Sequence, residues 1–226
     1  MPVHSHLRSL LTALCLLPFA ASQTSHAVAP ERSAPNASDG AEYRSLLQDT
    51  RIAYFKVVAG QGRDADNEAH TALSRLENAY PGDPIAKAYH GSLQLLDAAH
   101  SWAVWNLHQQ CAEGLNLLDE AVNEAPDDPE VRFLRAATDW HLPAFYHRRA
   151  QAESDFSWLA ARAETDARNG NLPPELAAAA SSYWGQILEK RSDEDGARRA
   201  WQQAVHIAPQ SPAGLDAQRR ISQLNY

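Results

Sequence analysis

Three proline-containing turns divide this chain, and they constrain its fold more than any other feature. Each turn places two prolines three positions apart, at Pro81 and Pro84 in the first case and at 126–129 and 209–212 in the others. Proline is excluded from helix interiors but fits the first helical position, where its missing N–H is no loss. We therefore expect each turn to end one helix and to begin the next. The polar residue just before the second proline would cap the new helix. This assigns N-cap roles to Asp83, Asp128 and Ser211.

The helix before each turn carries the same register of small and large apolar residues. The register has three positions in each helix: the second lies four residues after the first, and the third lies seven residues after it. The first proline of the turn follows twelve residues after the first position. Small residues beside a large one let two helices approach closely, so we expect this register to pack helix pairs. With the glycines at the matching place in neighbouring helices, the predicted packing residues are Ala69, Leu73, Leu76, Gly91, Gly114, Leu118, Ala121, Gly185, Ala197, Trp201 and Ala204.

This register resembles that of the tetratricopeptide repeat, a helix–turn–helix unit of about 34 residues. Residues 178–211 match one repeat without a gap, with Trp184 and Gly185 in its first helix. The other copies are irregular, because the first prolines of successive turns lie 45 and then 83 residues apart. The resemblance implies an α-solenoid of antiparallel helix pairs over residues 41–226, with a degenerate middle unit and a C-terminal capping helix.

The hydrophobic pattern favours helix throughout this region. No segment shows the sustained period-2 alternation that a sheet requires, so we expect an all-α fold. The predicted helices are 43–59, 65–80, 84–108, 111–125, 129–142, 147–168, 175–190, 193–208 and 212–224.

The first 27 residues have the layout of a secretory signal peptide. A basic start precedes an apolar run, residues 10–21, which is too short to span a bilayer as a helix. Small residues follow at the spacing that a signal peptidase reads, and they allow cleavage after Ser22 or Ala27. We therefore expect an exported protein, periplasmic in location, with no membrane span once the signal is removed.

Residues 28–40 are small, polar and proline-containing, and they predict a flexible linker. Leu14 precedes Cys15 at a position where lipidation would need a small residue, so we do not expect a lipoprotein. Cys15 leaves with the signal. Cys111 remains alone, and we expect it to be buried because it lies in a helical apolar pattern.

Composition and motifs restrict the function classes. Acids outnumber bases 28 to 20, for a net charge of -8, which argues against nucleic acid as the main partner. The sequence contains no phosphate-binding glycine loop, GxSxG elbow, HExxH pair or CxxC pair. We therefore expect a protein that is not an enzyme and needs no cofactor.

One alternative stays open: a metal-handling or hydrolytic site on a helical scaffold. It would use His141 and His147, with Asp139 and Glu153 nearby in the sequence. The six-residue step between the histidines crosses a proline and is no recognised ligand spacing. Histidines that pack at helix ends explain the pattern better.

The tetratricopeptide resemblance also implies a concave face, lined by the first helix of each repeat. Carried over by register, its residues are Ile85, Ala88, Ser92, Leu95, Leu96, Glu130, Phe133, Ala137, Trp140, His141, Ala179, Ser182, Gln186, Glu189 and Lys190. From these we predict as partner-binding residues Phe133, Ala137, Trp140, His141, Ser182, Gln186, Glu189 and Lys190.

Aromatic residues concentrate between residues 102 and 158. Such residues at helical spacing belong to a core by default, and a binding surface is the alternative. The functional expectation is a non-catalytic scaffold of the cell envelope that binds a protein or peptide partner. Self-association is also possible.

Overall fold

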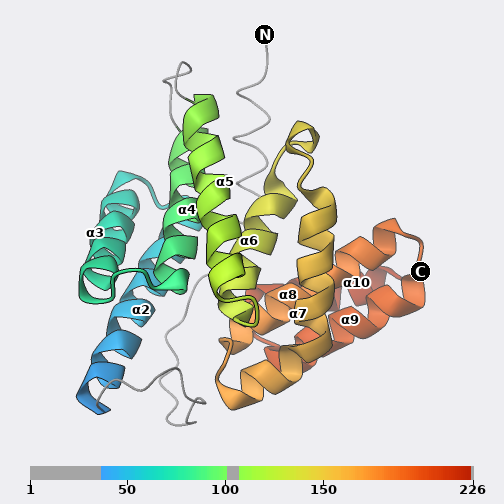
Figure 1. The fold of residues 1–226 in the computed structure, drawn as a ribbon. Coiled ribbons are helices and arrows are strands. Elements are labelled where there is room, and N and C mark those ends of the chain that lie inside the picture. The colour runs from blue at the N-terminus through green and yellow to red at the C-terminus, as the bar shows by residue number, and fades with distance from the viewer. Residues whose placement is uncertain (1–36, 101–106, 225–226) are drawn as a thin grey trace. The chain divides into compact units, whose positions relative to one another are not determined.

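The computed structural model describes residues 37–100 and 107–224. Within them the chain forms nine α-helices, one short 3-10 helix and no strand, which confirms the predicted all-α class. In chain order the elements in Figure 1 are α2 (Ala37–Val58), α3 (Arg63–Ala79), α4 (Pro84–His100), α5 (Leu107–Glu124), α6 (Pro129–His141), η2 (Ala144–Tyr146), α7 (Arg149–Asn169), α8 (Pro174–Lys190), α9 (Glu194–Ile207) and α10 (Pro212–Gln223).

The helices follow the predicted order, with two differences in their bounds. The helix predicted over 84–108 ends at His100, and residues 107–108 belong to α5, which begins at Leu107 rather than at 111. Helix α2 begins at Ala37, six residues earlier than expected, so residues 37–40 are helical and do not belong to a flexible linker. The predicted signal peptide and the rest of the linker lie outside the described residues, as do Trp102 and Trp105.

The three proline turns cap the helices as the sequence predicts. Asp83 Oδ1 accepts from the backbone N–H of Ile85 at 2.7 Å, and Asp128 Oδ1 accepts from that of Glu130 at 2.9 Å. Ser211 Oγ accepts from Gly214 N at 3.1 Å. Each bond satisfies one of the donors that a helix start leaves without an intrahelical partner.

The chain divides into two compact units. The first contains α2 to α5 and residues 141–143, and the second contains α6, η2 and α7 to α10. Consecutive helices pack against each other within each unit, as α2 with α3, α4 with α5, α7 with α8, α8 with α9 and α9 with α10. All eleven predicted packing residues are buried, and Cys111 is buried as expected.

In the first unit, two glycines bring the backbones of α4 and α5 together. A Cβ on Gly91 would lie 2.6 Å from the carbonyl oxygen of Gly114, and a Cβ on Gly114 would lie 2.8 Å from the carbonyl oxygen of Gly91. These separations are shorter than carbon–oxygen contacts allow. The absence of a side chain at both positions therefore sets the close approach of this pair.

A buried tyrosine links α2 to α4 in the same unit. The Tyr54 hydroxyl and the Ser92 hydroxyl lie 2.7 Å apart, and the Tyr54 ring packs edge-on against Tyr89 with centroids 5.1 Å apart. Burial raises the pKa of Tyr54 to about 12, and the hydrogen bond to Ser92 opposes part of that rise. The folded state therefore favours the neutral phenol.

This shift predicts a loss of stability at high pH. Between about pH 10 and pH 12 the unfolded Tyr54 has released its proton while the folded one retains it, so stability falls as pH rises. We expect this residue to contribute a loss of about 2 kcal/mol across that range. Urea unfolding at a series of pH values measures it. The control is the Tyr54→Phe, Ser92→Ala double variant, which lacks both hydroxyls and should have a shallower pH profile. Parallel profiles would refute the assignment.

In the second unit, the core centres on aromatic rings and alanines. Phe156 of α7 packs edge-on against Phe133 and Trp140 of α6, each with centroids 6.4 Å apart, and stacks on Tyr183 of α8 at 4.8 Å. Trp201 of α9 is fully buried among alanines of α8, α9 and α10.

None of the described helices is both long enough and apolar enough to cross a membrane.

Candidate partner-binding surface

The structure sorts the predicted partner-binding residues by exposure. Phe133, Ala137, Trp140 and Ser182 are each at most 6% exposed, so they offer a partner almost no surface in this conformation. The two aromatic residues, Phe133 and Trp140, are buried because their rings pack on Phe156. Those with accessible surface are His141, Gln186, Glu189 and Lys190.

The remaining residues carried over for the concave face are buried as well. Ile85, Ala88, Leu95 and Leu96 belong to the core of the first unit, and Ser92 bonds to Tyr54. On the other two helices Glu130 and Ala179 are buried too. Helix α8 therefore keeps more of the predicted residues accessible than α4 does.

Two cations from different helices lie over the ring of Trp140. The guanidinium carbon of Arg149, on α7, is 3.9 Å from the ring centroid, and the Nζ of Lys190, on α8, is 4.5 Å from it. Both distances fall within the range in which the ring quadrupole attracts a cation. Both cationic residues are exposed while the ring is buried, so Trp140 positions the charges and does not itself present surface.

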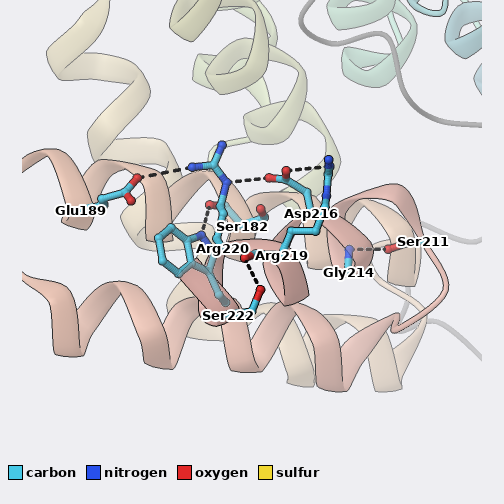
Figure 2. Close-up of polar contacts among 9 residues, drawn as sticks. Ser182, Glu189, Ser211, Gly214, Asp216, Arg219, Arg220 and Ser222 are labelled. Carbon is cyan, nitrogen blue, oxygen red and sulfur yellow. Dashed lines mark hydrogen bonds and ion pairs between the residues drawn. The ribbon is translucent and has the colours of Figure 1, made fainter. Parts of the chain in front are cut away.

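Helix α10 adds a third cation to this region. Arg220 bonds to Glu189 of α8 at 3.3 Å and to Asp216 at 2.7 Å, as Figure 2 shows. Asp216 also accepts from Arg219 at 3.0 Å. These contacts hold Arg220 across from the C-terminal turn of α8.

The cations of this region act on one another. The pKa of Lys190 is lowered, first by partial burial of the amine and then by the positive charges of Arg149 and Arg220. Glu153 and Glu189 oppose the shift. We call the group formed by Trp140, Arg149, Gln186, Glu189, Lys190 and Arg220 the Trp140 surface.

Sequence reasoning missed Arg149 and Arg220. Arg149 lies just after the irregular segment that contains η2, where repeat register gives no guide to its direction. Arg220 lies in the predicted C-terminal capping helix, to which the sequence assigned no binding residue. Only the packing of α7 and α10 against α8 brings the two arginines toward Lys190.

A second cluster of charges in this unit is buried. Asp155 accepts from Arg135 through both of its oxygens, at 2.8 and 3.0 Å, and from Arg132 at 2.7 Å. Arg132 also lies over the Trp158 ring at 4.5 Å, and Arg162 lies over it at 4.2 Å. Asp155 is almost fully buried, so this cluster links α6 to α7 and presents no carboxylate to a ligand.

The histidine alternative gains no support from the geometry. Among the described residues no group of three or more histidine, cysteine, aspartate or glutamate side chains could hold a metal ion. Glu153 forms an ion pair with Arg191, the residue that follows α8. His147 follows η2 with a φ of 56°, which is a turn conformation, and its side chain is exposed.

Comparison of the chain with protein-family models, curated proteins and solved structures gives no match.

Proposed function

We propose that this protein is a non-catalytic binding module of the cell envelope, built from tetratricopeptide-like helix pairs in a solenoid and exported to the periplasm. It holds an extended peptide or a protein segment on the Trp140 surface. The observation that carries the proposal is the pair of exposed cations, Arg149 and Lys190, fixed over one buried indole ring.

The charge of the Trp140 surface suggests the chemistry of the partner. Of the surface's three cations, Arg220 is already paired with Glu189 and Asp216, whereas Arg149 and Lys190 lie exposed over the ring. Exposed cations attract the carboxylates of acidic segments and favour their association at that place. Two of the cations are already ordered over a ring, so a partner carboxylate meets them without the loss of side-chain freedom that usually opposes such contacts.

Substitution of an accessible residue tests this proposal without disturbing the core. Lys190→Ala removes an exposed amine and leaves the buried ring of Trp140 in place. We expect this variant to bind acidic peptides about fivefold more weakly, the effect of one partly exposed ion pair. Titration of the isotopically labelled protein by NMR, with a peptide pool rich in aspartate and glutamate, measures the change and maps the surface.

Lys56→Ala is the charge-matched control, since Lys56 is an exposed lysine on α2 that pairs with Glu68. It should bind like the parent, and a lysine-rich peptide pool should leave the Trp140 surface unshifted. Equal binding of acidic peptides by the parent and by Lys190→Ala would place the interface elsewhere.

A further inference from the structure

A groove of about 560 Å³ lies among α7, α8 and α9 of the second unit, which Figure 1 labels. Its volume is in the range of sites that hold small ligands. Alanines of α7 and α9 line much of it, namely Ala160, Ala161 and Ala200, and two larger apolar side chains of α8 complete the apolar part, Trp184 and Leu188. The groove is open to solvent on one side, so a ligand can enter without movement of a helix.

This groove is separate from the Trp140 surface. Each residue of an α-helix turns the side chain by about 100°, so positions 184 and 188 share one face of α8, while positions 186 and 190 lie on nearly the opposite face. Gln186 and Lys190 contribute to the Trp140 surface, whereas Trp184 and Leu188 line the groove. One helix thus serves two surfaces.

The start of α9 supplies an acid to the groove. Asp193 caps α9, with Oδ1 accepting from Gly196 N at 2.9 Å. A Cβ on Gly196 would lie 2.2 Å from Asp193 Oδ2, so the glycine leaves room for the carboxylate beside the groove lining. The capping bond uses one carboxylate oxygen, and the negative charge stays at this end of the groove.

A cation lies farther along the same helix. Arg199 lines the groove, is exposed, and forms no ion pair or hydrogen bond with another described residue. Asp193 and Arg199 are six residues apart, which corresponds to about 9 Å along a helix axis. The groove therefore has an acid and a base at separate places along one wall and an apolar surface between the helices.

We propose that this groove binds short peptides of two or three residues with free termini. The N-terminal ammonium pairs with Asp193, the C-terminal carboxylate pairs with Arg199, and an aliphatic side chain packs against Trp184 and Leu188. An extended chain of this length spans about 7–10 Å, which is comparable to the axial rise between positions 193 and 199 of about 9 Å. The proposal does not depend on the function assigned to the Trp140 surface.

Four forms of one tripeptide test it, alanyl-leucyl-alanine with free termini, N-acetylated, C-amidated and blocked at both ends. NMR titration of the full chain should shift the indole N–H of Trp184 and the amide of Gly196, and leave Gln186 unshifted. We expect each block to weaken binding about threefold, because ion pairs in an open groove contribute modestly.

Two variants assign the charges. Asp193→Asn keeps a capping oxygen and removes the negative charge, so it should abolish the preference for a free N-terminus alone. Arg199→Gln should abolish the preference for a free C-terminus alone. Arg168→Gln, an exposed arginine in the last turn of α7, is the matched control and should change neither.

Filling the groove gives an independent test. Ala161 is exposed on α7, so Ala161→Leu should fold normally and weaken the free tripeptide about fivefold or more by occupying its place. Ala112→Leu, at an exposed alanine of α5, is the control. The proposal is overturned if the blocked and free peptides bind alike, or if the groove signals do not shift. Binding of acidic peptides at the Trp140 surface is measured separately, so failure of this proposal is distinguishable from failure of the proposed function.

Discussion

Replacing Asp155 with alanine is expected to lower the free energy of unfolding by about 3–5 kcal/mol. The carboxylate is nearly inaccessible to solvent and accepts from Arg135 through two parallel bonds, with a further bond from Arg132. Removing it leaves the desolvated guanidinium of Arg135 without its bidentate partner, and this desolvation accounts for most of the loss. Urea unfolding followed by circular dichroism measures the change.

Glu153→Ala provides the matched control for this substitution. Glu153 lies two residues earlier on α7 and pairs with Arg191, whose side chain is 53% exposed. An exposed pair of this kind contributes at most about 1 kcal/mol. Asp155→Asn, which keeps the shape and one acceptor oxygen, should fall between the two alanine variants. A loss for Asp155→Ala no larger than that for Glu153→Ala would contradict the structural role of the cluster.

The sequence was most informative where a local rule determines the structure. The prolines at 84, 129 and 212 can occupy only the first turn of a helix, and an acid or a serine before each supplies the cap. The first residue of each of these three helices could therefore be predicted from the sequence. The small residues of the packing register were predictable for a similar reason, because only Gly91 and Gly114 allow the backbone contact between α4 and α5.

The candidate site was predictable only in part. Register assigned Gln186, Glu189 and Lys190 to one face of α8 and left them accessible, as the structure shows. It also assigned Phe133 and Trp140 to a surface, although both are buried. The repeat register predicts which residues share one face of a helix. It does not predict which neighbouring helix covers that face. Here Phe156 packs against both rings, and it comes from a helix beyond the irregular segment.

The charged contacts could not be predicted for a related reason. Arg149 meets Trp140 and Arg132 meets Asp155 only after α7 has packed on α6. Long polar side chains reach several neighbours, and their choice depends on tertiary packing rather than on sequence spacing. The groove lined by Arg199 could not be predicted either, because its lining residues come from three helices, α7, α8 and α9, that meet only in the folded protein.

Trp201→Ala is expected to lower the free energy of unfolding by about 4 kcal/mol. The side chain is fully buried, and its indole N–H donates to the carbonyl of Ser182 at 3.2 Å. The alanine would leave a large cavity among small neighbours, which cannot collapse far because most are alanines already. Denaturant unfolding of the parent and the variant gives the difference directly.

Gly185, which lies against this indole, allows a second test of the same contact. A Cβ on Gly185 would lie 2.3 Å from Trp201 Nε1, so Gly185→Ala should destabilise the parent by about 1–3 kcal/mol despite the better helix propensity of alanine. In the Trp201→Ala background the obstacle is gone, and the same substitution should become neutral or stabilising by up to about 1 kcal/mol. The two changes are therefore strongly non-additive in a double-mutant cycle. Additive effects would show that Trp201 does not pack on Gly185, and the contact between α8 and α9 would need another explanation.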